Sequence, residues 1–429
     1  MNYQETVQFL YAAVPCFQNQ GGGAYKPGLE RVLAMSEAIG NPHLCGIKYI
    51  HIAGTNGKGS TSCSLAAVLA ASGYRTGLFT SPHLVDFRER IRINGICIDE
   101  DFVIDFVEEV MPLLKAFTPS FFELTTLMAF SYFAKNQVDI AVIETGMGGR
   151  LDSTNVISPL LSIITNVSLD HTQFLGDTLV KIATEKAGIM KSHTLTVIGE
   201  AQGEIRQVFE QKAQELRAPI YFADEESVLK KVEPMNTGLS LYTEDYGQVF
   251  FQLGGKAQVY NARTILLALR LLKEKFSLNI SQSAVQDGLG RVVQATGLRG
   301  RWEQIAYSPR IICDTGHNSG GIALVVEQLQ NESYNVLHIV FGMVSDKDVA
   351  AVLQLLPKSA KYYFCAPESD RALPAQDLQE KAQIFDLKGE VFSSVQEAVL
   401  AAEHCAHKDD LIYIGGSNFI VAQVLGLKF

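Results

Sequence analysis

The sequence predicts an α/β protein with a large domain on a mostly parallel sheet and a smaller Rossmann-like domain after it. Apolar, strand-like runs alternate with helical patterns along most of the chain, which is typical of a doubly wound sheet. This alternation breaks near residues 296–300 and then starts again. The 429 residues, 47% of them hydrophobic, also exceed what one ordinary core needs. We therefore expect an N-terminal domain over residues 1–296, a linker over 297–300 and a C-terminal domain over 301–429.

Each part of the chain contributes its own strands and helices. In the first part we expect strands over residues 50–53, 76–79, 138–145 and 160–166, and helices over 62–71, 102–115, 123–135, 260–276 and 284–293. Residues 221–252 are more polar and alternating, which favours a small antiparallel addition. After the break, strands are expected over 310–314, 336–341, 361–365 and 410–414. Because ligands of such sheets bind at the carboxyl ends of parallel strands, functional groups are expected there.

The turn after the first of these strands is the most informative part of the sequence. It is rich in glycine, contains one lysine and ends in hydroxyl residues: Gly54, Thr55, Asn56, Gly57, Lys58, Gly59, Ser60 and Thr61. Glycines let backbone N–H groups approach phosphates, the following helix adds partial positive charge, and Ser60 can face Mg²⁺. The spacing differs from the usual phosphate loop, so a plain strand-to-helix turn is the alternative. An isolated lysine has no packing use in such a turn, which favours a phosphate-binding domain of the P-loop type.

Polar residues also follow four further strand ends. They occupy residues 80–84, 144–152, 166–171 and 314–318. An acidic residue and a histidine at neighbouring ends, here Glu144 and His171, suit a divalent ion that bridges nucleotide phosphates, because Mg²⁺ prefers carboxylate, hydroxyl and water ligands. Taken alone, His171 is better explained as a hydrogen-bonded core histidine and Glu144 as a turn cap. Only their combination favours a magnesium site.

Composition and charge exclude several classes of protein. A net charge of −10 and a pI near 5.5, with no basic run, argue against nucleic acid as a partner. The N-terminus lacks the pattern of a signal peptide, and no apolar run is long enough to span a bilayer. The seven cysteines are scattered and form no C-x-x-C pair, as in reduced proteins of the cytoplasm. We expect a cytoplasmic enzyme that acts on small molecules.

Together these residues resemble the Mur ligase superfamily of ATP-dependent amide-forming ligases, and more closely its folate branch, the folylpolyglutamate synthase and bifunctional dihydrofolate synthase family. The matching stretches cover nearly the whole chain in order: residues 26–31, 54–60, 80–84, 89–91, 121–123, 144–155, 170–172, 185–189, 300–302, 314–318 and, less specifically, 415–417. The runs 81–84 and 148–155 are the most specific. The chain departs from the family pattern at Thr315, Gly316 and Ser319.

The resemblance implies a mechanism and a set of site residues. ATP would lie between the domains and phosphorylate a folate or dihydropteroate carboxylate, and the amine of L-glutamate would displace phosphate from the resulting acyl phosphate. The family pattern implies that Lys58 and the loop amides hold the phosphates, and that Asn261, Arg301 and Asp314 also contact ATP. It implies Mg²⁺ ligands, with two ions expected, among Ser60, Ser81, Glu144 and His171. Substrate contacts are implied for Ser81, Pro82, His83, Phe122, Arg150, Asp152, His317 and Ser417, although Arg150 and Asp152 fit structural turn residues equally well.

Lys186 has two interpretations. In this superfamily the matching lysine is commonly carbamylated, which would turn a cation into an anion suited to Mg²⁺. Without the resemblance, an ordinary lysine paired with Glu185 or a nearby carboxylate is the simpler interpretation.

Three questions stay open from the sequence. A cell-wall amino-acid ligase of the same superfamily and a nucleotide-binding module without ligase activity are the alternatives to a folate ligase, although residues 26–31 and 121–123 favour folate. Dihydrofolate synthase and folylpolyglutamate synthase activities are not separated. We expect a monomer, with no sequence feature that settles the oligomeric state.

Overall fold

A large, mostly parallel sheet forms the centre of the N-terminal part of the molecule. The structure, a computed structural model, describes residues 1–14 and 27–427. The sheet has eight strands in the order β4-β3-β2-β5-β1-β6-β7-β8. Six of these strands, from β2 to β8 in this order, are parallel, and β3 and β4 add an antiparallel edge. Their bounds are β1 Lys48–Ala53, β2 Thr76–Phe79, β3 Ile91–Ile93, β4 Ile96–Cys97, β5 Ile140–Glu144, β6 Leu161–Ile164, β7 Leu195–Ile198 and β8 Ile220–Phe222.

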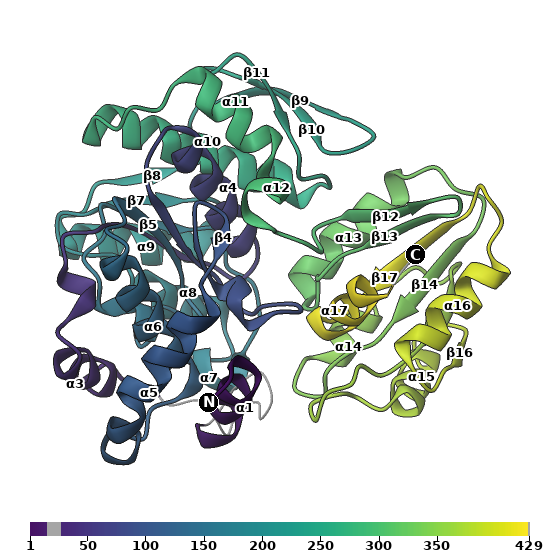
Figure 1. Cartoon of the computed structure of the whole chain (residues 1–429). Coiled ribbons are helices and arrows are strands. Elements are labelled where there is room, and N and C mark those ends of the chain that lie inside the picture. The colour runs from purple at the N-terminus through teal and green to yellow at the C-terminus, as the bar shows by residue number, and fades with distance from the viewer. Residues whose placement is uncertain (15–26, 428–429) are drawn as a thin grey trace.

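Helices cover both faces of this sheet and bury its apolar side chains (Figure 1). One face packs against α4 (Lys58–Ala71), α10 (Ala257–Phe276), α11 (Gln282–Gly290) and α12 (Val292–Thr296). The other carries α1 (Tyr3–Ala13), α3 (Glu30–Ala38), α5 (Glu100–Phe117) and α6 (Phe121–Lys135). The remaining helices follow β6 and β7: α7 (Thr172–Leu175), α8 (Leu179–Ala187) and α9 (Gly203–Leu216). Short 3₁₀ turns occur at η2 Pro42–Leu44, η3 Phe87–Arg90 and η4 Ser153–Val156.

A small antiparallel sheet interrupts the helical layer, as the polar alternation of residues 221–252 predicts. It consists of β9 (Leu229–Pro234), β10 (Leu239–Thr243) and β11 (Gln248–Phe251). The expected single helix over 284–293 is wrong: Arg291 leaves the helical region and separates α11 from α12. At this break Val293 N donates a hydrogen bond of 2.8 Å to the side chain of Gln252, the residue after β11. This bond takes the place of a backbone hydrogen bond within a continuous helix.

The C-terminal part is a second doubly wound sheet with the strand order β12-β13-β17-β14-β15-β16. All neighbours except β12 and β13 are parallel. The strands are β12 Glu303–Tyr307, β13 Arg310–Cys313, β14 Leu337–Phe341, β15 Lys361–Phe364, β16 Gly389–Val391 and β17 Leu411–Gly415. One face packs against α13 (Ser319–Asn331), α14 (Val349–Leu353) and α15 (Ala375–Gln383), and the other against α16 (Val395–Cys405) and α17 (Asn418–Gly426). This confirms the predicted α/β fold class with its smaller Rossmann-like part.

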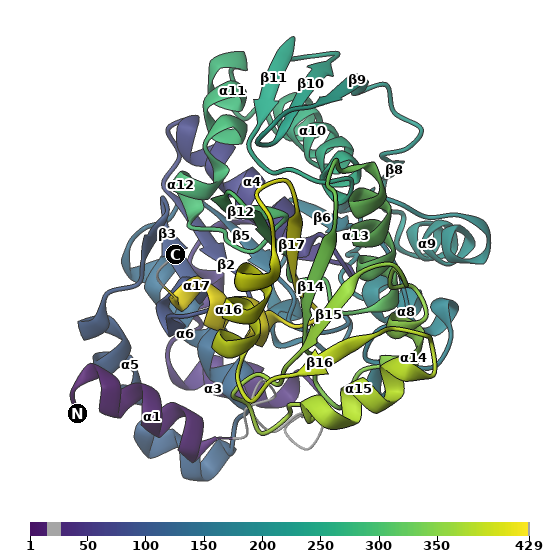
Figure 2. The same ribbon diagram turned by 90° about the vertical axis from the view of Figure 1, so that its right-hand side faces the viewer.

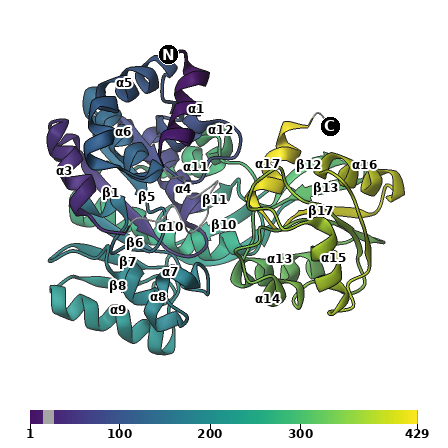
Figure 3. The same ribbon diagram turned by 90° about the horizontal axis from the view of Figure 1, so that it is seen from below.

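The two parts lie side by side and face each other across the strand ends. We call the part built from α1 to α12 the N-terminal lobe and the part from β12 to α17 the C-terminal lobe. In Figures 1 and 3, α13 and α17 lie on the side of the C-terminal lobe that faces the large sheet. Figure 2 shows the C-terminal sheet in front of the N-terminal lobe. Within the described ranges, no helix is both long and apolar enough to cross a membrane.

Candidate functional site

The strand register brings the predicted site residues of the N-terminal lobe together. Ile52 of β1 pairs with Glu144 at the end of β5, and Ala53 pairs with Ile164 of β6. Phe79 of β2 pairs with Ile143, which places Ser81 beside the same edge. Together with the facing C-terminal lobe, this edge encloses a cavity of about 360 Å³.

Nearly all residues expected at the site line this cavity. They are Gly54, Thr55, Asn56, Gly57, Lys58, Gly59, Ser60, Ser81, Pro82, His83, Phe122, Glu144, Asp152, His171, Lys186, Asn261, Arg301, Asp314, His317 and Ser417. The structure places two others elsewhere. Thr61 is fully buried on the core side of α4, and Arg150 is 54% exposed and pairs with Glu185 at 2.8 Å. Lys26 of the family motif lies outside the described residues.

The phosphate loop has the shape that glycine permits. Gly54 and Gly57 adopt positive φ angles of 152° and 82°, where a Cβ would collide with Thr165 and with the Asn261 amide respectively. α4 then begins at Lys58 without a side-chain cap, so its first N–H groups face the cavity edge. Lys58 Nζ folds back and donates to the carbonyl oxygens of Gly54 and Thr55 at 3.1 and 3.3 Å. This loop can cradle an anion with both backbone and ammonium donors.

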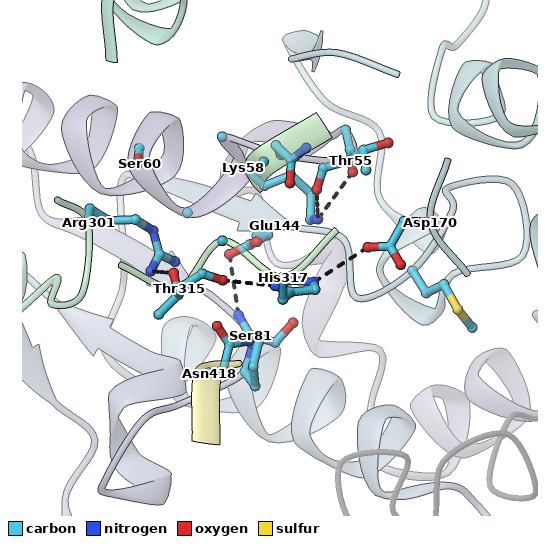
Figure 4. A pocket seen from close by; sticks show the side chains of 18 of the residues that line it. Thr55, Lys58, Ser60, Ser81, Glu144, Asp170, Arg301, Thr315, His317 and Asn418 are labelled. Atoms are coloured by element: carbon cyan, nitrogen blue, oxygen red, sulfur yellow. Dashed lines mark hydrogen bonds and ion pairs between the residues drawn. The ribbon is translucent and has the colours of Figure 1, made fainter. Parts of the chain in front are cut away.

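Glu144 provides a buried carboxylate beside the loop (Figure 4). Burial raises the pKa of Glu144 to about 7, against the opposing influence of Lys58 and of the hydrogen bond from Ser81 N at 3.3 Å. A cation bound nearby would stabilise the ionised form of this buried carboxylate. A Cβ on Gly59 would lie only 3.8 Å from Glu144 Oε2, so the start of α4 is close to it. Ser60 lies at the same helix end, where its Oγ accepts a hydrogen bond from Gln258 at 3.2 Å.

The oxygen ligands offered by Glu144 and Ser60 suit Mg²⁺ better than they suit a metal whose ligands all come from the protein. Among the described residues, no cluster of three or more His, Cys, Asp or Glu side chains could hold a metal ion. One carboxylate and serine hydroxyls leave most ligand positions to water and phosphate oxygens, which is the way Mg²⁺ is usually bound. His171 lies beyond them at the N-cap of α7, and burial together with Lys347 lowers its pKa to about 3, so the imidazole is neutral.

Asp170, a residue of the predicted polar strand end 166–171 for which no role was expected, connects the two lobes. Its carboxylate contacts Lys347 Nζ at 2.5 Å, Asn318 Nδ2 at 3.0 Å and His317 Nε2 at 3.5 Å, all from the C-terminal lobe. Burial alone would raise the pKa of Asp170, but the hydrogen bond from His317 and the charge of Lys347 lower it below its usual range. The sequence signal was available, since both Asp170 and Lys347 follow buried strands.

The groups of the C-terminal lobe are held by its own backbone. Asp314 accepts hydrogen bonds from Trp302 N at 2.8 Å and Gly316 N at 2.7 Å. Arg301 contacts the hydroxyl of Thr315, one of the residues that departs from the family pattern. His317 Nδ1 lies 2.9 Å from the carbonyl oxygen of Thr315, and its other nitrogen faces Asp170 (Figure 4). These contacts place Arg301 and His317 toward the phosphate loop.

An aromatic region forms the other end of the cavity. A Cβ on Gly146 would collide with the ring of Phe122, so that ring lies flat on the turn after β5. Arg90 Nε donates to His83 Nδ1 at 2.8 Å, and the other nitrogen of His83 lies 3.0 Å from the hydroxyl of Tyr11. Asp152 accepts from Met147 N and Thr154 N, so it organises this turn. Flat apolar rings with a few fixed polar groups suit a planar aromatic ligand.

Comparison with known proteins agrees with this geometry. A model of the Mur ligase middle domain matches residues 52–269, and a model of the Mur ligase glutamate ligase domain matches residues 300–418. The chain is 32% identical over 412 residues to the dihydrofolate synthase/folylpolyglutamate synthase of Bacillus subtilis, covering 93% of this chain and 94% of that one. The Escherichia coli protein of the same name is 31% identical and covers 93% of this chain and 90% of that one.

Solved structures give the same result. The structure of E. coli FolC in complex with DHPP and ADP superposes with a TM-score of 0.85 at 29% identity, covering 99% of this chain and 97% of that one. A Mycobacterium tuberculosis folylpolyglutamate synthase complexed with ADP and AMPPCP has a TM-score of 0.85 at 30% identity, with coverages of 94% and 96%. The chain therefore belongs to the folylpolyglutamate synthase/dihydrofolate synthase family of Mur ligases.

Proposed function

We propose that the protein adds L-glutamate to the carboxylate of a folate or dihydropteroate, with ATP and Mg²⁺, through an acyl phosphate. One observation carries the proposal: a single cavity is lined by the phosphate loop, by Glu144 and by Asp314 and His317 of the other lobe. Membership of a family of ATP-dependent amide-forming ligases supports it. A relative solved with Mn, AMPPNP and L-glutamate bound, with a TM-score of 0.82, supports the choice of nucleotide, divalent ion and amino acid.

The residues of the chain divide the work of phosphoryl transfer. Lys58 and the N–H groups at the start of α4 hold the β- and γ-phosphates of ATP, because they present positive charge where negative charge accumulates. Ser60 and Glu144 would hold Mg²⁺ near the nucleotide phosphates, and Ser81 and His171, which line the same cavity, would lie toward the acceptor carboxylate. When bound, the ion neutralises phosphate charge and orients the transferred group. Arg301 and Asn261 approach the nucleotide from the sides of the loop.

Amide formation then needs the second substrate to enter from the C-terminal lobe. Asp314, His317 and Ser417 lie on that wall and bind the nucleotide or glutamate. The amine attacks the acyl carbonyl, phosphate leaves through a tetrahedral intermediate, and the amine loses a proton. The aromatic end formed by Phe122 and His83 holds the pterin. Action as a monomer in the cytoplasm completes the proposal and rests on the sequence.

The test is direct. Pure protein is incubated with ATP, Mg²⁺, L-glutamate and either dihydropteroate or a tetrahydrofolate, and the products are weighed by mass spectrometry. We expect acceptor-dependent products that are heavier by whole glutamate residues, and the preferred acceptor separates the two activities. Phosphate release without amide would instead support a nucleotide-binding module, and product only with cell-wall precursors would support the other branch of the superfamily.

A further inference from the structure

A reciprocal pair of side-chain amides joins the phosphate loop to the C-terminal lobe. Asn56 lies between β1 and α4, and Asn318, 262 residues later, is the N-cap of α13. Asn56 Nδ2 donates to Asn318 Oδ1 at 3.1 Å, and Asn318 Nδ2 donates to Asn56 Oδ1 at 3.0 Å. Two antiparallel hydrogen bonds fix the orientation of the two groups as well as their separation.

Other hydrogen bonds determine which way each amide points. Gly321 N donates to Asn318 Oδ1 at 2.8 Å, so the nitrogen of that amide must face Asn56 and Asp170. The second hydrogen on Asn56 Nδ2 points to Ser168 Oγ at 3.2 Å. Each amide hydrogen of the pair therefore has an acceptor, and neither amide can be flipped without placing a donor against a donor or an acceptor against an acceptor.

The backbone of Asn56 is fixed as firmly as its side chain. Its N–H donates to Asn166 Oδ1 at 3.0 Å, and its carbonyl oxygen accepts from Thr165 Oγ1 at 2.6 Å. Both partners follow β6. Asn56 thus joins the end of the parallel sheet to the other lobe, and it lies only two residues before Lys58. A shift of Asn318 would therefore act directly on Asn56, which belongs to the same glycine-rich loop as Lys58.

The start of α13 is shaped for this contact. A Cβ on Gly320 would lie 2.8 Å from Ser168 Oγ and 3.3 Å from Asn56 Nδ2, and one on Gly321 would lie 3.5 Å from Asn56 Oδ1. Glycine is a poor helix former, so two successive glycines in the first turn of a helix need a local reason. For Gly320, close approach to Ser168 and Asn56 supplies that reason independently of the hydrogen bonds, whereas a Cβ on Gly321 would be at an ordinary contact distance from Asn56.

We propose that Asn56 and Asn318 are positioning residues for ligation: the amide pair forms when the lobes close and holds the phosphate loop in the alignment that phosphoryl transfer needs. This inference rests on the proposed function and goes beyond it. ATP still binds without the pair, since Lys58 and the loop N–H groups remain. The transfer step suffers, because small errors in alignment of the reacting atoms are costly.

Two variants and their combination test the pair. Asn56→Ala removes one partner, and Asn318→Ser removes the other while keeping an N-cap oxygen for Gly321 N. We expect each to lower kcat for amide formation about 10- to 100-fold. Because both variants break the same pair, the kcat of the double variant should be no lower than that of the less active single variant. The Kd of Mg²⁺ and a non-hydrolysable ATP analogue, measured by calorimetry, should change less than about threefold. Ser394→Ala, which removes the N-cap contact of α16 to Glu397 N, is the control for stability of the C-terminal lobe and should leave kcat unchanged.

Several outcomes would overturn the inference. They are an unchanged kcat in either single variant, losses that multiply in the double variant, or a loss explained by nucleotide affinity alone. Small-angle scattering gives a readout that needs no folate: with the ATP analogue, the wild type should be more compact than Asn56→Ala. Equal compaction overturns the role of the pair. Pair-dependent compaction in a protein that forms no folate amide would refute the proposed function and support the pair.

Discussion

The cavity has an N-terminal wall, formed by residues of the N-terminal lobe, and a C-terminal wall, formed by residues of the C-terminal lobe. The two walls differ in how the charge of their buried ionisable groups is stabilised. On the N-terminal wall, burial shifts the pKa of Glu144 and that of Lys186 to about 7, so both groups are held short of full ionisation by their surroundings. On the C-terminal wall, Lys347 has a carboxylate partner, and Asp314, whose pKa burial also raises, accepts two backbone hydrogen bonds that oppose this rise. The buried groups of the N-terminal wall can therefore be stabilised by charged ligands. The contacts of the C-terminal wall instead fix the positions of its own side chains. We therefore expect the N-terminal wall to meet most of the phosphate and metal charge, and the C-terminal wall to align the nucleotide or glutamate that it binds.

The largest effect is expected at the centre of the N-terminal wall. Lys58→Ala removes the full positive charge of the phosphate loop, while its hydrogen bonds to Gly54 and Thr55 contribute only to the local shape. We expect kcat to fall about 10²-fold or more with the fold intact, because charge on the transferred group grows in the transition state. Steady-state kinetics and circular dichroism measure the two effects.

A matched lysine sets the baseline for that experiment. Lys181 is exposed and pairs only with Asp177, four residues earlier on the surface. Lys181→Ala should keep wild-type kcat. Near-normal turnover in Lys58→Ala would show that the glycine-rich turn has no role beyond linking β1 to α4, and the contrast between the two walls would then be wrong.

The second effect concerns Lys186 on the same wall. The alternative pairing with Glu185 is not found, because Glu185 pairs with Arg150. Lys186 is buried, and burial lowers its pKa to about 7, so much of it is a neutral amine near neutral pH. A neutral amine is the form that reacts with CO₂: its nitrogen attacks the carbon, loses a proton and becomes a carbamate anion. We predict a carbamate on Lys186.

Three measurements check the carbamate. A high-resolution crystal structure should show carboxyl density on Lys186, and Lys186→Ala should lose about 10- to 100-fold in kcat, partly restored by a short carboxylic acid. The neutral fraction grows as pH rises through about 7, so activity at low CO₂ should rise over the same range. A bare ammonium in the crystal, with full activity of Lys186→Ala, would contradict the prediction.

A smaller effect is expected on the C-terminal wall at Lys347. Lys347→Ala leaves the buried Asp170 carboxylate with Asn318 and His317 but without its ammonium partner. We expect a stability loss of about 1–3 kcal/mol and a drop in kcat of about tenfold, because the lobes are aligned less firmly. Thermal melts and kinetics separate the two. Lys358→Ala, in an exposed pair with Asp386 of the same lobe, is the control and should change neither. Loss of nucleotide binding in Lys347→Ala would instead show that Lys347 supports the nucleotide site and not only the alignment of the lobes.

Most of the site could be predicted because parallel strands bring their carboxyl ends to one edge. Glu144, Ser81, His171 and the loop at Lys58 follow buried apolar runs, so strand assignment alone places them together. The fold class followed from the same alternation. Thr61 was misplaced because one further residue along α4 turns the side chain away from the cavity and into the core.

Contacts between the lobes could not be predicted in this way. Asp170 and Lys347 are 177 residues apart, and their contact depends on how two separate sheets pack against each other. The amide pair of Asn56 and Asn318 has the same origin. No periodicity or spacing within one segment encodes such a docking geometry, so these residues were visible only as polar ends of strands and loops.

The smallest effect is expected for Arg150→Ala, which tests whether the substrate site extends beyond the N-terminal wall to Arg150. The family pattern implied a substrate contact there, but the structure directs this side chain to solvent, where it is 54% exposed and bound to Glu185. Exposed ion pairs contribute about 0–1 kcal/mol, so Arg150→Ala should shift the melting temperature little. Its kcat and its KM for the folate acceptor should stay within about twofold of wild type, since the turn around it is held by Asp152 and by Asn155 Nδ2, which donates to the Arg150 carbonyl at 3.1 Å. Asp152→Asn is the matched comparison, because it perturbs the same turn from the cavity side, and we expect it to raise KM for the acceptor. A larger rise in KM from Arg150→Ala than from Asp152→Asn would extend the substrate site beyond the cavity and onto the exposed surface of α8.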